Sequence, residues 1–223
     1  APYVLDEGFL RGVFESLRPY GGTALFRASS VPARDIAQAI ETLNLANAKV
    51  QRSGGDVLLV REGALPGSAD WTHQYGDIAQ TIKSDDQLVK LPLGVLWFGG
   101  SSHNDVLPRH GHGPPEQVIG GRMFIEGMGV ISARDVYTGR VLWKRELAGL
   151  GEGVYWDDTY NTDPLTLKYG QVHIPGANAR GANYVATEDK VYIAFGRECL
   201  VLDAATGDQV TAFTLPHRPG ESE

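Results

Sequence analysis

Residues Ser132–Trp143 read SARDVYTGRVLW, which is a strand, an Asp-x-x-Thr-Gly turn and a second strand. The pattern returns in weaker form at Leu200–Val210 as LVLDAATGDQV. In each copy the Asp side chain is expected to accept hydrogen bonds from backbone N–H groups of the turn, and the Gly to supply the positive φ that closes a hairpin. A turn unit that recurs with the same flanking strands indicates a repeat architecture.

Each copy extends upstream into a further hairpin. Residues Gln117–Gly127 and Asn183–Gly196 each read as strand, tight turn and strand. Counting onward predicts four strands per unit, which is the content of one β-propeller blade. The string ARDVYTGRVLW closely resembles the tryptophan-docking repeat of quinoprotein (PQQ-like) propellers, and this resemblance implies that Trp143 packs against the neighbouring blade. In the second copy Thr211–Phe213 stands where the tryptophan should fall.

The spacing of the two turns bounds the number of units. Asp135 and Asp203 are 203 − 135 = 68 positions apart, whereas propeller repeats usually run about 40–50 residues. The excess lies in Gly149–Arg180, which we expect to form a long loop over one face. Residues 70–215 then hold roughly three blades, and closed propellers need about 4–8. We therefore expect an internal segment of a larger protein, in which the rest of the parent polypeptide or another chain completes the propeller.

The first third of the chain has a different pattern. Apolar residues at helical spacing predict helices at Phe9–Leu17 and Ala33–Ala46, with a short strand at Thr23–Phe26 between them and a hairpin at Lys49–Arg61 after them. This order, with the string LRPYGG at 17–22, resembles the C-terminal part of class I S-adenosylmethionine-dependent methyltransferases. The resemblance implies an α/β C-terminal piece of a Rossmann-like methyltransferase fold. No glycine-rich cofactor loop precedes Leu17, so this chain is not expected to bind the methyl donor.

The segment that joins the two patterns completes the expected organisation. Residues 71–77 (WTHQYGD) and 109–112 (RHGH) resemble the entry to the propeller in large bacterial proteins that carry a methyltransferase-like domain immediately before PQQ-like repeats. The predicted domains are therefore a methyltransferase-like part at 1–62, a linker and propeller entry at 63–77, and propeller blades at 78–223. The expected fold class is an α/β piece followed by all-β blades of an incomplete propeller.

Composition excludes some partners. The chain is 42% hydrophobic, with a formal net charge of −7, and no cluster of Lys and Arg offers a track for phosphates, so nucleic acid is not expected as a partner. No apolar run approaches the ~20 residues of a membrane span. The single cysteine, Cys199, lies in an apolar strand pattern and is expected to be a buried, inert thiol. The compartment stays open, and an exported or periplasmic location is favoured.

Histidines supply the main candidate for a metal site. His110 and His112 form a His-x-His pair, which points both imidazoles to one side of an extended segment and can ligate Zn or Cu. His73, His103 and His173 can complete the set, with Asp105 hydrogen-bonded to a ligand. The alternative is a structural role, in which the histidines of this Gly- and Pro-rich loop bind backbone carbonyls.

Two other groups are weaker candidates for ligand binding. Arg109 can bind a carboxylate or phosphate, although a lone arginine is more often solvated or salt-bridged. Asp157, Asp158 and Asp163 in the long loop can offer oxygen ligands to Ca²⁺, but EF-hand spacing is absent. No cofactor follows from the residues.

Three classes of function remain. The first is a binding or scaffold module without chemistry of its own. The second is an oxidoreductase with a metal or quinone at the propeller axis, and the third is a methyltransferase whose cofactor half lies outside this chain. The scaffold is preferred because it alone needs no residue that the chain lacks.

Overall fold

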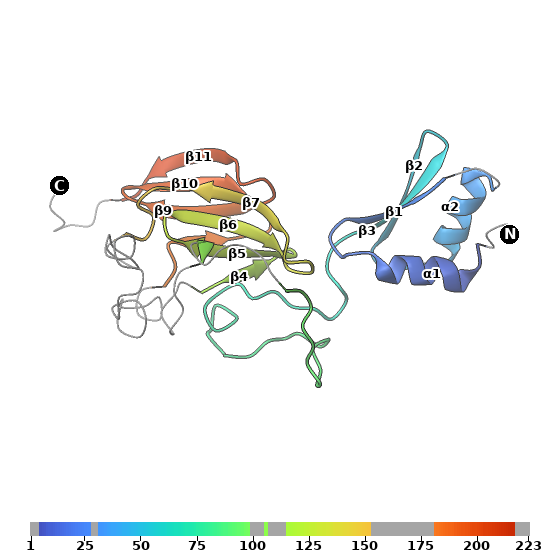
Figure 1. Cartoon of the computed structure of the whole chain (residues 1–223), viewed down its shortest axis with the longest axis horizontal. Coiled ribbons are helices and arrows are strands. Elements are labelled where there is room, and N and C mark those ends of the chain that lie inside the picture. Colours follow the sequence, from blue (N-terminus) through green and yellow to red (C-terminus); the bar gives the residue numbers. More distant parts are fainter. Residues whose placement is uncertain (1–4, 28–30, 99–104, 107–114, 153–180, 217–223) are drawn as a thin grey trace. The chain divides into compact units, whose positions relative to one another are not determined.

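The computed structural model describes residues 5–27, 31–98, 105–106, 115–152 and 181–216. The chain divides into two compact units, residues 1–68 and 69–223 (Figure 1). Among the described helices, none is long and apolar enough to cross a membrane.

The first unit contains the predicted order of helix, strand, helix and hairpin. Its elements are α1 (Glu7–Ser16), β1 (Gly22–Phe26), α2 (Ala33–Thr42), β2 (Ala48–Ser53) and β3 (Asp56–Arg61). The helix α2 ends earlier than its sequence pattern predicts. The strands form one three-stranded sheet in the order β1-β3-β2.

The two helices of the first unit are amphipathic and share one hydrophobic core with the sheet. Apolar residues at helical spacing place one face of each helix on the core, while the other face carries charged and polar side chains. The fully or nearly fully buried members of this core are Leu10, Phe14, Ile36, Ala37, Ile40, Val57 and Leu59. Asp6 caps the first helix by accepting a hydrogen bond from the N–H of Phe9 at 2.7 Å.

The expected Rossmann-like methyltransferase piece is wrong. Strand β3 pairs antiparallel with both β1 and β2, so the described sheet contains no parallel pair. A Rossmann-like sheet requires parallel neighbours joined by a helical crossover. Apart from the end of α2, the local patterns predict the elements and the β2–β3 hairpin, but they do not encode the pairing of β1 with β3. Here the hairpin folds β3 back between β2 and β1, and the structure as a whole is mostly β.

The second unit contains two four-stranded antiparallel sheets. The first sheet consists of β4 (Gln117–Ile119), β5 (Arg122–Gly127), β6 (Val130–Asp135) and β7 (Val141–Glu146). The second sheet consists of β8 (Tyr184–Ala186), β9 (Lys190–Phe195), β10 (Glu198–Asp203) and β11 (Gln209–Thr214). Strands that are consecutive in the chain are neighbours in each sheet, as the four-strand repeat predicts.

The two sheets have the same register throughout. Phe124 pairs with Gln117 and with Ala133, and Ala133 pairs with Trp143. Adding 68 to each of these numbers gives the pairs of the second sheet, in which Thr211 takes the place of Trp143. The register shifts at equivalent points, after Ala133 and after Val201. The weak sequence repeat is therefore a full structural repeat, and any residue of one sheet has a defined equivalent in the other.

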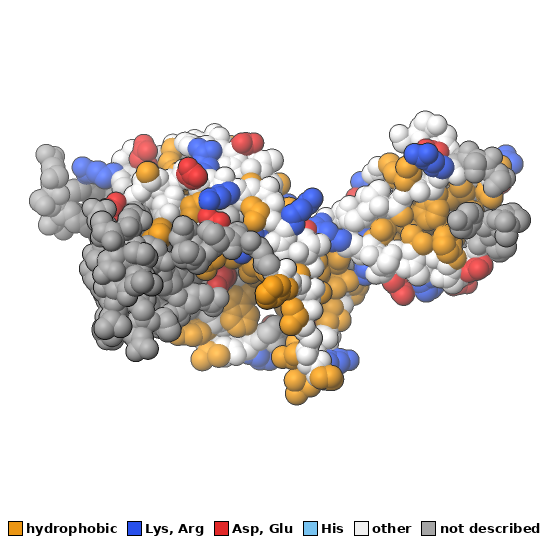
Figure 2. Space-filling model, viewed as in Figure 1, with side chains coloured by type: hydrophobic (Ala, Val, Ile, Leu, Met, Phe, Trp, Pro, Cys, Tyr) orange, Lys and Arg blue, Asp and Glu red, His pale blue; other side chains and the backbone are white. Residues whose placement is uncertain are grey.

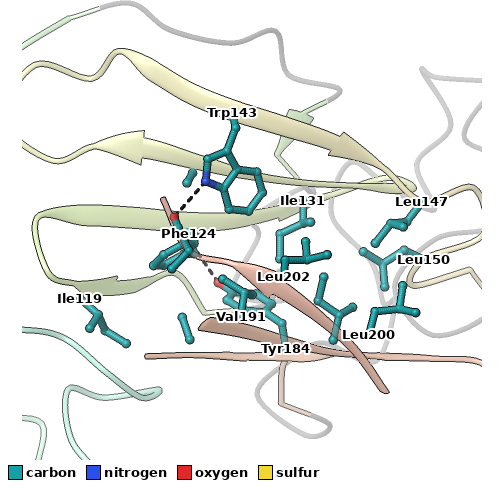
Figure 3. Packing of buried hydrophobic residues seen from close by; sticks show 14 residues of the cluster. Ile119, Phe124, Ile131, Trp143, Leu147, Leu150, Tyr184, Val191, Leu200 and Leu202 are labelled. Carbon is teal, nitrogen blue, oxygen red and sulfur yellow. Dashed lines mark hydrogen bonds between the residues drawn. The ribbon is translucent and has the colours of Figure 1, made fainter. Parts of the chain in front are cut away.

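The sheets pack face to face over a common core (Figure 3). From the first sheet and the segment after it come Ile119, Phe124, Ile131, Ala133, Trp143, Leu147 and Leu150. From the second sheet and its last turn come Tyr184, Ala186, Val191, Ile193, Leu200, Leu202 and Ala204. Alternate residues along each strand enter this core, as the two-residue period of a strand requires.

The number of predicted blades is also wrong for the described part of the chain. Residues 69–98 form no third four-stranded sheet; their described pairings are the isolated bridges Trp71 to Val118 and His73 to Gly76. The described strands close no propeller. The expectation of a third blade came from dividing length by repeat spacing, which counts residues but not strand partners. No α-helix occurs among the described residues after Asp77.

Candidate functional site

The Asp-x-x-Thr-Gly turns have the predicted hydrogen bonds. The carboxylate oxygen Oδ1 of Asp135 accepts from the N–H groups of Tyr137 and Thr138 at 2.9 and 3.2 Å. Asp203 accepts from Ala205 and Thr206 at 2.9 and 3.1 Å. These backbone hydrogen bonds favour the ionised form and lower the pKa of Asp203. Each turn is thus held rigid at the end of its sheet.

Trp143 docks on the turn of the second sheet, as its motif implies. Its indole Nε1 donates a hydrogen bond to the carbonyl of Ala204 at 3.0 Å, and its ring lies against Gly207. A Cβ on Gly207 would stand 2.6 Å from the indole ring, and the glycine has a φ of 75°. Glycine is therefore required at this position both by the close approach of the ring and by the backbone conformation.

A second docking tryptophan, Trp97, was missed by sequence reasoning. Its Nε1 donates to the carbonyl of Val136 at 2.9 Å, and its ring lies against Gly139 so closely that a Cβ there would clash. Val136 and Gly139 are the equivalents of Ala204 and Gly207, so the two contacts are the same. The signal in the sequence is the tripeptide Val-Leu-Trp, which occurs at 95–97 and 141–143, with its tryptophans 143 − 97 = 46 residues apart.

Polar side chains join the two sheets beside the apolar core. The Gln117 side chain donates to the carbonyl of Tyr184 at 3.1 Å and accepts from the N–H of Ala186 at 2.8 Å. The Tyr184 hydroxyl donates to the carbonyl of Phe124 at 2.8 Å. These bonds satisfy buried backbone groups and set the position of β8 against the first sheet.

Glu126 is a buried carboxyl group whose pKa is strongly raised. Its side chain is on the face of the first sheet that meets the second, and the residue is 2% exposed. Oε1 accepts from the Asn183 amide at 2.8 Å, whereas Oε2 has no hydrogen-bond partner among the described residues. Burial raises the pKa of Glu126 to about 7, although the hydrogen bond from Asn183 opposes the shift. The equivalent residue in the second sheet is Ala194, so this carboxyl group belongs to the first sheet alone.

The opposite face of the first sheet is also polar. Ser132 and Arg134 are buried there, and the Ser132 hydroxyl and two guanidinium nitrogens of Arg134 have no partner among the described residues. Their equivalents, Leu200 and Leu202, pack in the core between the sheets. This face therefore has donors where the corresponding face of the second sheet is apolar.

The histidines predicted as metal ligands are not brought together in the described part of the chain. His73 is described, and its Nδ1 lies 2.7 Å from the Thr72 hydroxyl on the surface. His110 and His112 lie outside the described residues, as do His103, His173, Arg109, Asp157, Asp158 and Asp163. Within the ranges that the structure describes, no three His, Cys, Asp or Glu residues are placed to hold a metal ion. The site at these histidines stays a prediction.

Two further sequence candidates have defined surroundings. Asp105 forms an ion pair with Lys144 at the edge of a pocket of about 350 Å³, which Val130 and Glu146 also line. Cys199 is a free and buried thiol, as predicted.

Comparison with known proteins gives no family. No protein-family model and no curated protein sequence matches the chain. The resemblance to PQQ-like repeats therefore stays a prediction, which rests on the residues described above.

Replacing Trp143 tests the docking contact. We expect Trp143→Ala to lower the free energy of unfolding by about 3–5 kcal/mol, because it opens a cavity between the sheets and leaves the Ala204 carbonyl without its donor. Trp143→Phe keeps most of the ring volume and should cost about 1–2 kcal/mol. Urea unfolding of both variants measures the difference, and equal losses would show that ring packing contributes nothing, because both variants lack the hydrogen bond to Ala204.

The tight glycine contact of Trp97 has a matched control. Gly139 and Gly196 have similar positive φ values, 70° and 60°, but nothing lies within 4 Å of a Cβ at Gly196. Gly196→Ala should cost only the backbone strain, about 1–2 kcal/mol. Gly139→Ala should cost clearly more, since it also pushes Trp97 off the turn. If denaturant midpoints show the same loss for both, the ring does not pack there in solution.

Glu126 predicts a pH dependence of stability. In the unfolded chain the carboxyl ionises near its ordinary pKa of 4.5, whereas the folded protein keeps the proton up to about 7. Because the unfolded state binds fewer protons in this window, stability is greatest below the lower value and falls as pH rises through 7, by about 3 kcal/mol in all.

Glu126→Gln should remove this fall and make the protein more stable than the parent at pH 8. Thermal or urea unfolding between pH 4 and pH 8 measures it. The exposed Glu198→Gln variant is the control and should keep the parent's profile. A Glu126→Gln variant that follows the parent's profile would refute the assignment.

Proposed function

We propose that the chain is a polypeptide-binding scaffold module without chemistry of its own, and a segment of a multidomain PQQ-like repeat protein. Two features support the repeat assignment. The two sheets share one register, and each Asp-x-x-Thr-Gly turn receives a tryptophan through the same hydrogen bond and glycine contact. In this arrangement each sheet offers one face to the sheet before it and one to the sheet after it.

The observation that carries the proposal is the exposed part of the second sheet's outer face, formed by Val185, Tyr192, Ala194, Thr211 and Phe213 around the buried Cys199 and Val201. Four of these residues are equivalent to Gln117, Phe124, Glu126 and Trp143, with which the first sheet binds the second. On the second sheet all five are exposed, including three large apolar side chains. Four positions that make the interface in one copy of the repeat are therefore exposed in the other.

A further β-sheet is the occupant that this face fits best. The described neighbour of the equivalent face is a four-stranded sheet, so shape and spacing are already defined by the repeat. Exposed apolar patches on a sheet also mark sites of association between polypeptides. We infer that the rest of the parent polypeptide, or another chain, supplies this sheet.

The other functions receive less support. No observation on the described residues favours an oxidoreductase with a metal or quinone. The methyltransferase depended on a Rossmann-like piece, and the antiparallel three-stranded sheet of the first unit contradicts that piece.

Self-association of the purified chain tests the scaffold. Without its partner, the uncovered face should associate with other copies, and light scattering after gel filtration should show oligomers that grow with concentration. Tyr192→Lys with Phe213→Lys should shift the chain to a monomer, because each buried lysine would lose its hydration. The control pair is Gln51→Lys with Ser53→Lys, at exposed positions of the first unit. A parent chain that stays a stable monomer would contradict the proposal.

A further inference from the structure

The segment before the first sheet exposes an unusual amount of apolar surface. Val95 and Leu96 are 82% and 70% exposed, and Leu93 and Phe98 are exposed as well. Figure 2 shows hydrophobic side chains on the surface of this segment, which is the green stretch before β4 in Figure 1. Monomeric proteins rarely expose contiguous apolar patches of this kind without a binding role.

The repeat identifies what the segment is. Val95–Trp97 has the same sequence as Val141–Trp143 in β7, and Trp97 docks on the first sheet as Trp143 docks on the second. Residues 95–97 form no strand and bend at Leu96, but by sequence and by the docking of Trp97 they correspond to the outermost strand of a sheet stacked before the first sheet. The exposure differs: Val141 is only 39% exposed, and Leu142 packs against the core.

The difference in exposure has a simple cause. Strand β7 pairs along its length with β6, so that Trp143 lies opposite Ala133. Residues 95–98 pair with no strand among the described residues. Within the described ranges no strand pairs with their backbone N–H and C=O groups, and the side chains of Val95, Leu96 and Phe98 are exposed.

We propose that Val95–Phe98 is an acceptor edge for an incoming antiparallel β-strand, which pairs with it as β6 pairs with β7. The inference rests on the scaffold function proposed above and names its second binding surface. The occupant is an extended strand of the same repeat type, with a small residue opposite Trp97. Main-chain hydrogen bonds hold such an added strand, and side-chain pockets select it.

The strand does not come from the residues directly before the edge. In both described sheets the outer strand follows its partner through an Asp-x-x-Thr-Gly turn. Residues 85–94 read DDQLVKLPLG and lack this turn. Instead, Asp86 accepts hydrogen bonds from the N–H groups of Leu88 and Val89, both at 2.8 Å, and holds them in a separate turn. The partner strand must enter from another stretch of polypeptide.

The polar face of the first sheet agrees with this occupant. In the core between the two sheets, β6 packs with Leu200 and Leu202. A strand added beside Trp97 would occupy the corresponding place over Ser132 and Arg134. These two residues have donors without acceptors among the described residues. The incoming strand is therefore expected to carry a hydrogen-bond acceptor, such as a carboxylate, next to its small residue.

A segment exchange tests whether the edge accepts a strand. Residues 85–94 are replaced by a copy of residues 131–140, so that the full chain reads ISARDVYTGR directly before Val95. Amide hydrogen exchange at residues 95–98 should slow about tenfold or more, because these amides become part of a hairpin. The control is the same replacement of residues 85–94, but with proline at the second and fourth positions of the inserted segment. In this control the rate of amide hydrogen exchange at residues 95–98 should stay as in the parent.

A second measurement covers failure of the exchanged chain to fold. A synthetic peptide with the sequence of residues 129–139 is added to the unaltered chain, and protection at 95–98 is expected at saturating peptide. If the folded exchanged chain shows no slowing, or if that chain does not fold and the peptide gives no protection, the acceptor edge is refuted.

The outcomes separate this inference from the scaffold proposal. If the amides of residues 95–98 stay unprotected while Tyr192→Lys with Phe213→Lys still abolishes self-association, only the acceptor-edge proposal is refuted. If 95–98 becomes protected while the parent chain is a stable monomer, the edge stands and the open face of the second sheet does not bind polypeptide.

Discussion

The docking of an indole on an Asp-x-x-Thr-Gly turn is the contact on which the arrangement of the second unit depends. A tryptophan from one sheet places its N–H on a carbonyl of the next turn and its ring on that turn's glycine. The hydrogen bond fixes the orientation of the indole on the turn, and the large ring buries apolar area against the glycine. A single side chain therefore sets both the distance and the orientation between neighbouring sheets. The Asp side chain makes the turn a rigid receiver by binding its backbone N–H groups.

The interface between the sheets combines this contact with polar groups of unequal character. Gln117 and Tyr184 are satisfied by backbone partners and help to define one alignment of the sheets. Glu126 has one partner for two oxygens, and burial raises its pKa to about 7. A buried carboxyl of this kind weakens an interface when ionised. The same interface is therefore both specific in geometry and sensitive to proton concentration.

The repeat has a direction, because each sheet uses two different faces. The first sheet contacts its neighbour with the face that carries Trp143, whereas the second sheet contacts the first with the face that carries Leu200 and Leu202. Heterologous stacking of this type does not end by itself; it continues until a ring closes or an end is covered. The described stack has an open feature at each end, namely the face around Tyr192 and the edge at Val95–Phe98. Both are recognised in the same way: in the other copy of the repeat, the equivalent residues are covered by a sheet or paired with a strand.

The sequence by itself determined the local elements and the repeat. Asp135, Gly139 and their equivalents predict their turns because the required conformations and hydrogen bonds are local. The sequence also predicts the hairpin pairs, whereas the pairing of β1 with β3 and the packing of one sheet on the other were decided only by the tertiary structure. The position of β3 between β1 and β2 is set by contacts between residues far apart in sequence, so a Rossmann-like pattern and an antiparallel sheet read alike along the chain. Likewise, the sequence gives no sign that Glu126 is unusual, because its carboxyl group is desolvated only when the second sheet packs against the first. The repeated tripeptide Val-Leu-Trp marks Trp97 in the sequence, but its docking is established by the contact of its ring with Gly139.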